Sequence, residues 1–102
     1  MSKYRLWVED RAKPEVRVLP GNIRQRVKRA IAELAENPRP HNSRALEAPE
    51  GIALELRRIR LDRWRILYAI DEGDSGVGVY GVRQRPPYDY EDLADLFGET
   101  KQ

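Results

Sequence analysis

Hydrophobic and polar residues alternate along the region 54–90, and this region predicts the centre of the fold. Residues 64–70 are apolar on both faces from Ile66 onward. Such a run is typical of a strand in the interior of a sheet, covered on both sides. Two-residue alternation also marks the segments before and after it. We therefore predict three antiparallel strands with tight turns at 62–63 and 72–76, and an exit loop that begins at Pro86 and Pro87.

The first of these strands changes its hydrophobic phase part of the way along. Leu56 and Ile59 fall on opposite phases, and this slip predicts a β-bulge at Arg57 and Arg58. In the second turn, residues 72–76, two glycines are expected to supply the positive φ angles.

The chain before residue 54 predicts one strand and two helices. Residues 4–9 alternate as an edge strand, and residues 10–19 can hold a short helix with Pro14 in its first turn. Asn22 is a good N-cap for a longer amphipathic helix, which ends before Asn37 and Pro38. Residues 37–53, rich in proline, asparagine and serine, are expected to form a loop.

The C-terminal region predicts a further short helix that carries Leu93 and Phe97 on its apolar side. The whole chain, 1–102, is then a single α+β domain. It combines one antiparallel sheet, built from the N-terminal strand and the three-stranded meander, with helices on one face.

Composition narrows the possible chemistry. The 102 residues contain no cysteine and one histidine, so a disulfide framework, a thiolate metal site and a histidine-based catalytic cluster are not expected. The lone His41 is expected to be a surface residue rather than a base. No apolar run is long enough to span a bilayer and the N-terminus lacks a signal sequence. We therefore expect a cytoplasmic protein without a metal, a cofactor or a membrane partner.

The formal charge of +2 hides an asymmetry. Residues 89–102 hold five carboxylates against one lysine, so the rest of the chain is basic. A basic body suggests a polyanionic partner. The alternative is a solvated mixture of surface charges.

Arginine is the candidate functional residue type. Seven arginines gather toward one end of the predicted meander: Arg57, Arg58, Arg60, Arg63, Arg65, Arg83 and Arg85. Guanidinium groups on a rigid sheet can bind phosphate through planar paired donors. The alternative is a structural role in ion pairs with Asp62, Asp71 or Glu55. We expect Tyr68 and Tyr80 to pack in the core rather than to stack on bases.

Four short motifs, in order, resemble the RelE/ParE superfamily of bacterial and archaeal type II toxins. Residues 64–68 give an aromatic-Arg-apolar-apolar-Tyr run. Leu19 and Pro20 precede the long helix, residues 36–40 follow it, and residues 83–85 read Arg-Gln-Arg. The resemblance covers nearly the whole chain and implies the α+β fold described above.

RelE-like members cut mRNA on the ribosome without a metal, by attack of the 2′-OH on the adjacent phosphate, and this activity is what the resemblance implies. Arg65 would then clamp the scissile phosphate, and Arg85 would stabilise charge or assist the leaving oxygen. With Arg58, these two form the implied catalytic set. The implied substrate-binding residues are Arg60, Arg63, Arg83, Tyr88 and Tyr90.

The same resemblance implies a cognate antitoxin, which would cover the arginines or displace the helix around Leu93 and Phe97. It also leaves two alternatives open. RelE-type members often carry lysine on the second strand, where this chain has only arginine and places Leu56 at one expected basic position. Arginine is a poor general base. The chain can therefore also be a non-enzymatic ParE-like toxin that poisons DNA gyrase, or a degenerate member that only binds its antitoxin.

Overall fold

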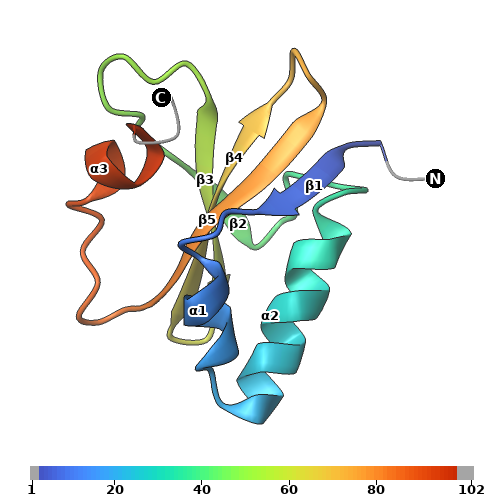
Figure 1. Cartoon of the computed structure of the whole chain (residues 1–102), viewed down its shortest axis with the longest axis vertical. Helices are drawn as coiled ribbons and strands as arrows, with labels where there is room; N and C mark the ends of the chain where they lie inside the picture. The colour runs from blue at the N-terminus through green and yellow to red at the C-terminus, as the bar shows by residue number, and fades with distance from the viewer. Residues whose placement is uncertain (1–2, 99–102) are drawn as a thin grey trace.

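The computed structural model describes residues 3–98, which form one sheet with helices on both sides (Figure 1). Glu99 and Lys101, part of the predicted acidic tail, lie outside the described residues. The elements in chain order are β1 (Arg5–Val8), α1 (Lys13–Arg17), α2 (Gly21–Glu33), β2 (Ser43–Leu46), β3 (Glu55–Leu61), β4 (Trp64–Asp71), β5 (Gly76–Gln84) and α3 (Leu93–Gly98). No helix within residues 3–98 has the length and apolar character needed to cross a bilayer.

The sheet has the strand order β1-β5-β4-β3-β2. The predicted antiparallel meander β3–β4–β5 is confirmed, with the apolar strand β4 at its centre. The structure adds β2, which lies in the segment expected to be a loop and pairs antiparallel with β3. β1 runs parallel to β5, so the sheet is mixed rather than wholly antiparallel. The helices α1 and α2 follow β1, and the chain then enters the sheet at its opposite edge.

Each face of the sheet has its own hydrophobic core. α1 and α2 cover one face, where Val27 and Leu34 pack with Ile66. α3 covers the other face and buries Leu93 and Phe97 with residues of β3, β4 and β5 (Figure 1). The prediction that the helices lie on one face is therefore wrong, because β4 is apolar on both faces and each needs its own cover.

The predicted bulge at Arg57 and Arg58 is also wrong. β3 pairs with β4 without interruption from Glu55 to Leu61, and its hydrophobic phase changes because the strand is buried on both faces. The register shift lies instead between β4 and β5, where Leu67 pairs with Gly81 and Tyr68 with Val79. Tyr80 is the extra residue of β5, and it joins the core under α3.

The turns and helix ends differ in detail from the sequence expectation. α2 begins at Gly21 after Pro20, with no side-chain cap, so Asn22 is not the N-cap. The turn at 62–63 is confirmed, with a φ of 57° at Asp62. In the β4–β5 turn, Ser75 rather than a glycine has a positive φ, at 51°.

Candidate functional site

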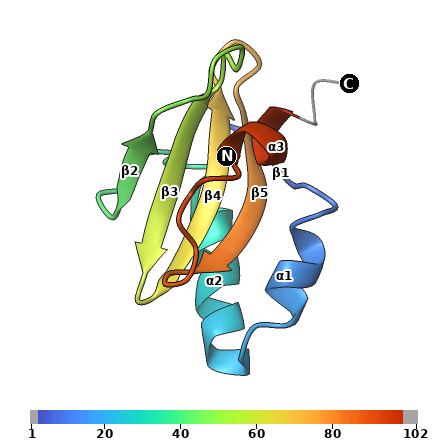
Figure 2. The same cartoon turned by 90° about the vertical axis from the view of Figure 1, so that its left-hand side faces the viewer.

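Four arginines lie on the face of the sheet that carries α3, toward the β3–β4 turn, as the strand register shows. Figure 2 shows α3 lying against this sheet, with the β3–β4 turn at the far end of the strands. Arg58 on β3 lies directly opposite Arg44 on β2. Arg60 on β3 lies directly opposite Arg65 on β4. Residues at alternate positions of a strand share a face, so the four side chains share the face of Leu56, which is buried under α3. We call Arg44, Arg58, Arg60 and Arg65 the arginine face.

The arginine face is electrostatically unsatisfied. Burial lowers the pKa of the half-buried Arg58 guanidinium, and the positive charges of Arg65, Arg44 and Arg60 lower it further, while Tyr90 opposes them. Like charges on directly opposed strand positions destabilise a sheet. An anion bound between these side chains would relieve both the repulsion and the loss of hydration.

Two buried donors at this face have no hydrogen-bond partner among residues 3–98. Arg65 donates from Nη1 to the backbone oxygens of Asp62 and Trp64, each at 3.0 Å, but its buried Nε is unpartnered. The hydroxyl of Tyr90 is buried and unpartnered as well. Tyr90 acts electrostatically on Arg58, so both orphaned groups belong to the surroundings of one cluster. Leaving buried donors unpaired is costly, and an oxygen-rich anion would supply the missing acceptors.

Arg85 approaches the cluster through Tyr90. Its guanidinium lies 4.9 Å from the centroid of the Tyr90 ring, within the range of a cation–π contact. Tyr90 has a φ of 65°, an uncommon conformation for a non-glycine residue that turns the exit loop back toward the sheet. That Arg65 and Arg85 serve one phosphate stays a prediction.

Arg83 shares the face of Arg65 but is held by two carboxylates. It donates from Nε to Glu15 at 2.9 Å and from Nη1 to Asp92 at 2.8 Å. Burial lowers the pKa of Arg83, but the two carboxylates outweigh burial and raise it overall. Glu15 also accepts a hydrogen bond from the backbone N of Val82 at 2.8 Å. Arg83 therefore fastens α1 and the segment before α3 to β5.

The remaining predicted site residues have different surroundings. Tyr88 is half-buried, and its hydroxyl donates to Asp92 at 2.6 Å. Burial and the neighbouring Asp92 carboxylate raise the pKa of Tyr88 above its ordinary range. Arg63 is exposed in the β3–β4 turn. Leu93 and Phe97 are buried, so a partner could contact them only by displacing α3.

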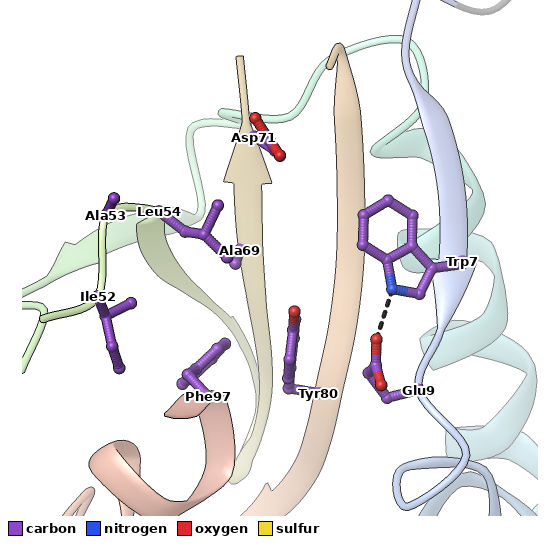
Figure 3. Close-up of a pocket in the computed structure, with 9 residues that line it drawn as sticks. All are labelled: Trp7, Glu9, Ile52, Ala53, Leu54, Ala69, Asp71, Tyr80 and Phe97. Carbon is purple, nitrogen blue, oxygen red and sulfur yellow. Dashed lines mark hydrogen bonds between the residues drawn. The ribbon is translucent and has the colours of Figure 1, made fainter. Parts of the chain in front are cut away.

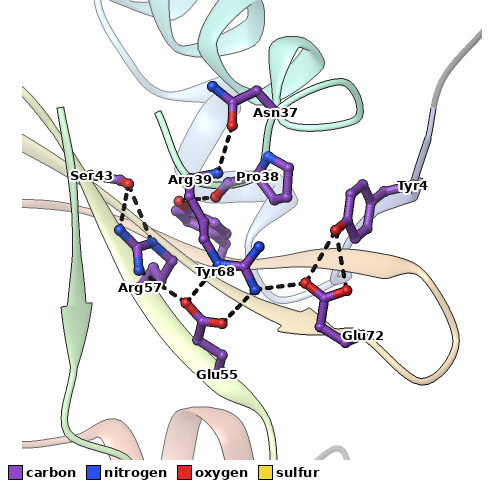
Figure 4. A network of polar contacts seen from close by, with 9 residues as sticks. All are labelled: Tyr4, Asn37, Pro38, Arg39, Ser43, Glu55, Arg57, Tyr68 and Glu72. Atoms are coloured by element: carbon purple, nitrogen blue, oxygen red, sulfur yellow. Dashed lines mark hydrogen bonds and ion pairs between the residues drawn. The ribbon is translucent and has the colours of Figure 1, made fainter. Parts of the chain in front are cut away.

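Arg57 belongs to a separate network on the opposite face (Figure 4). It donates to Glu55 at 2.9 Å and to Ser43 at 2.9 Å. Arg39 joins the same Glu55 at 2.7 Å and also Glu72 at 2.6 Å. These arginines tie the segment after α2 to β3 and to the β4–β5 turn. Because carboxylates hold both arginines, their role is structural. For Arg57, this is the ion-pair role that the sequence left open as an alternative.

Sequence reasoning missed two residues that shape the site. Arg44 was missed because its segment was expected to be a loop, although Ser-Arg-Ala-Leu at 43–46 carries a weak alternation. Glu15 gave no signal, because its pairing with Arg83 joins residues far apart in the chain. His41 is exposed. Within residues 3–98, no three histidine, aspartate or glutamate side chains gather into a possible metal site.

Comparison with known proteins identifies relatives. A sequence model of the family described as "ParE toxin of type II toxin-antitoxin system, parDE" matches residues 8–85. The fold is similar to the archaeal RelE–RelB complex from Pyrococcus horikoshii OT3, with a TM-score of 0.73 and 21% identity over 84% of this chain and 99% of that one. A comparison with curated proteins gave no significant match.

Two further solved structures share the fold. One is the RelBE toxin–antitoxin complex from Mycobacterium tuberculosis, with a TM-score of 0.65 and 24% identity over 83% of this chain and 94% of that one. The other is a mutant of the E. coli toxin RelE in the free state, with a TM-score of 0.65 and 21% identity over the whole of both chains. At these identities the structural similarity establishes the fold.

Proposed function

Because this chain belongs to the ParE toxin family of type II toxin–antitoxin systems, within the RelE/ParE superfamily, we propose that it is a toxin that cleaves ribosome-bound mRNA. The observation that carries the proposal is the arginine face with its two orphaned donors, Arg65 Nε and Tyr90 Oη. A repelling cluster of guanidiniums next to unpaired donors is suited to a phosphate.

The proposed reaction is attack of a 2′-OH on the adjacent phosphate, which leaves a 2′,3′-cyclic end. The 2′-oxygen bonds to phosphorus as the bond from phosphorus to the 5′-oxygen breaks; the 2′-OH proton would pass to water, and water would protonate the leaving 5′-oxygen. The developing phosphorane charge must be neutralised as well. Arg65 and Arg58 would hold the phosphate, and Arg85 would stabilise charge on the leaving side. The hydroxyl of Tyr90 would donate to a phosphate oxygen. Guanidiniums supply the positive charge, so the proposed step uses no metal or cofactor.

Dependence on the ribosome follows from the side chains at this face. Guanidinium is a poor general base because it stays protonated, and the carboxylates of Glu15 and Asp92, beside the neighbouring strand position, are held in ion pairs with Arg83. The toxin would therefore rely on the ribosome to order the mRNA so that its 2′-OH is aligned with the phosphate. Alignment of this kind can contribute a large part of a rate enhancement.

A cognate antitoxin is the proposed protein partner. The solved RelE–RelB and RelBE complexes pair toxins of this fold with antitoxins. An antitoxin would silence this chain either by covering the arginine face or by replacing α3 over the core that holds Leu93 and Phe97.

Gyrase poisoning is the second candidate, and the family description favours it, since the matching sequence model is that of ParE. ParE-like toxins keep this fold without the full set of RNase residues. In this reading the arginine face would have a binding role or none, and RNA cleavage would be absent.

One paired experiment distinguishes the two. The purified toxin is incubated with translating ribosomes, and mRNA ends are mapped by primer extension; in parallel, DNA gyrase supercoiling is measured. We expect new mRNA ends that are lost in Arg58→Ala and kept in Arg29→Ala, a control on the exposed side of α2. Gyrase inhibition without mRNA cleavage would refute the proposal.

Salt dependence tests whether binding rests on the arginine face. The logarithm of the affinity for single-stranded RNA should fall linearly with the logarithm of salt concentration, with a slope of about −0.7 for each phosphate contacted. Removing Arg58 should make the slope shallower by about one such contact. An unchanged slope in the variant would show that the RNA binds at another part of the protein surface.

A further inference from the structure

The exit loop, residues 86–92, joins β5 to α3 and is held at both ends. β5 fixes its first end. α3 fixes its second end, because the ring of Phe97 packs on Tyr80 with 4.4 Å between the ring centroids (Figure 3). Within the loop, the buried hydroxyl of Tyr90 has no hydrogen-bond partner in the part of the chain that the structure describes, and Tyr90 acts electrostatically on Arg58. A hydroxyl is an effective donor to a phosphate at that place only if the loop holds it there in advance.

A chain of polar contacts starts at α1 and ends on the exit loop. Glu15, on α1, accepts from Arg83 Nε at 2.9 Å, and Arg83 donates from Nη1 to Asp92 at 2.8 Å. Asp92 in turn accepts the hydroxyl of Tyr88 at 2.6 Å. Gly81 leaves room for the first of these contacts, since a Cβ there would lie 3.3 Å from both Arg83 Nε and Glu15 Oε1. The contact chain therefore fixes Tyr88 relative to β5 and α1.

Tyr88 passes this constraint on to Tyr90 through ring contacts. The two rings meet edge to face, with 4.9 Å between their centroids. The guanidinium of Arg83 lies 5.2 Å from the centroid of the Tyr88 ring, and that of Arg85 lies 4.9 Å from the centroid of the Tyr90 ring. Edge-to-face ring pairs and cations over ring faces are both attractive. These contacts hold the Tyr90 ring while they leave its hydroxyl unpaired.

We propose that this contact chain, from Glu15 to Tyr88, positions the Tyr90 hydroxyl at the arginine face for a phosphate of single-stranded RNA. The inference rests on the proposed function, because it takes the Tyr90 hydroxyl as a donor to phosphate. It goes further by making the members of the chain positioning residues that do not touch the RNA. Arg83 and Tyr88, which the resemblance placed among the substrate-binding residues, act on the RNA only through Tyr90.

The test measures affinity for an RNA that cannot be cleaved. The probe is a fluorescently labelled single-stranded RNA with 2′-O-methyl groups, which lacks the attacking hydroxyl, and its binding to the whole chain is followed by fluorescence anisotropy. Tyr90→Phe removes only the donor, so it should weaken binding about tenfold, the scale of one hydrogen bond to a charged group. Tyr88→Phe keeps the ring and loses the bond to Asp92. It should weaken binding about threefold, because a displaced donor loses part of the same bond.

A double variant separates positioning from a general loss of stability. If Tyr88 acts through the Tyr90 hydroxyl, Tyr88→Phe should have no further effect in the Tyr90→Phe background, because residues that share one contact are not additive. A purely structural role gives independent losses whose free energies add. Glu15→Gln should follow the same pattern as Tyr88→Phe, since it keeps an acceptor for the backbone N of Val82 but loses the charge that faces Arg83.

Tyr4→Phe is the matched control. The Tyr4 hydroxyl also donates to a carboxylate, that of Glu72 at 3.1 Å, but its ring packs with the core under α1 and α2. Its RNA affinity should equal that of the unaltered chain. Additive losses in the double variants, unchanged affinity in both Tyr88→Phe and Glu15→Gln, or no binding of the probe would overturn the proposal. Failure of the proposed function has a different result, namely uncut mRNA on the ribosome with this pattern of affinities preserved.

Discussion

Arg57 and Arg58 are neighbours on β3 with opposite surroundings, and this contrast gives a sharp test of the arginine face. Arg58 lies directly opposite Arg44 and close to other arginines. A like-charged pair directly across a sheet costs about 0.2–1 kcal/mol. Arg58→Met keeps most of the stem and removes the charge, so it should raise the free energy of unfolding by about 0.5–1 kcal/mol. For a domain of about this size, that corresponds to an increase in Tm of about 2–8 °C.

Arg57→Met is the matched control. Arg57 is 14% exposed and donates to Glu55 and to the buried Ser43. Losing it leaves the buried Ser43 oxygen without its donor and removes one of the two arginines that bind Glu55, which should lower the free energy of unfolding by about 1–3 kcal/mol. The same substitution on adjacent residues is thus expected to change stability in opposite directions.

Both variants are measured by thermal unfolding, followed by circular dichroism, and by fluorescence anisotropy with a labelled single-stranded RNA. Arg58→Met should melt higher and bind RNA more weakly. Arg57→Met should melt lower and bind RNA as the unaltered chain does. If Arg58→Met is destabilised like Arg57→Met and keeps full RNA affinity, the arginine face is a structural feature and the reasoning fails.

Three further predictions concern catalysis, the antitoxin and pH. Arg65→Ala or Arg85→Ala should each reduce single-turnover mRNA cleavage by about 10²–10³-fold, the scale of losing one transition-state donor, with only partial rescue by lysine; full activity in both variants would remove them from the site. Truncation after Asp89 should change antitoxin affinity in calorimetry, because it deletes α3, and an unchanged affinity would show that α3 takes no part. Arg39 and Arg57 hold the pKa of Glu55 below its ordinary value of 4.5, so its contribution to stability is present above pH 4.5 and lost as pH falls through the lowered pKa. The decline of Tm below pH 4.5 should therefore be shallower in Glu55→Gln, and an identical decline would contradict the ion-pair account.

The meander could be predicted from the sequence because its signal is local. Alternation and turn residues within 54–85 define three strands, and the apolar run of β4 places it at the centre. β2 could not be predicted in the same way, because Ser-Arg-Ala-Leu has little intrinsic strand preference and becomes a strand by pairing with β3. The face taken by α3 is likewise a tertiary property. The amphipathic spacing of Leu93 and Phe97 predicts a helix but does not state which core it covers.

The bulge in β5 shows why the phase of hydrophobic alternation alone does not locate a bulge in a sheet that is buried on both faces. A change of phase in β3 reflects burial on both faces, whereas the true irregularity places Tyr80 under α3. Both patterns read alike in the sequence, since each is a run of apolar residues on alternating phases. Only the pairing with the neighbouring strand distinguishes a bulge from a regular strand that is buried on both faces.

The assignment of arginines follows from where the carboxylates lie. Arg57 and Arg83 are paired with acids from other elements or neighbouring positions, namely Glu55 for the first and Glu15 and Asp92 for the second. Each such pair removes a guanidinium from the set available to a ligand. The arginine face differs because the strand register brings its members against one another. A cluster that repels itself weakens the fold unless an anion compensates it, and this cost is the physical argument that these arginines serve a ligand rather than the fold.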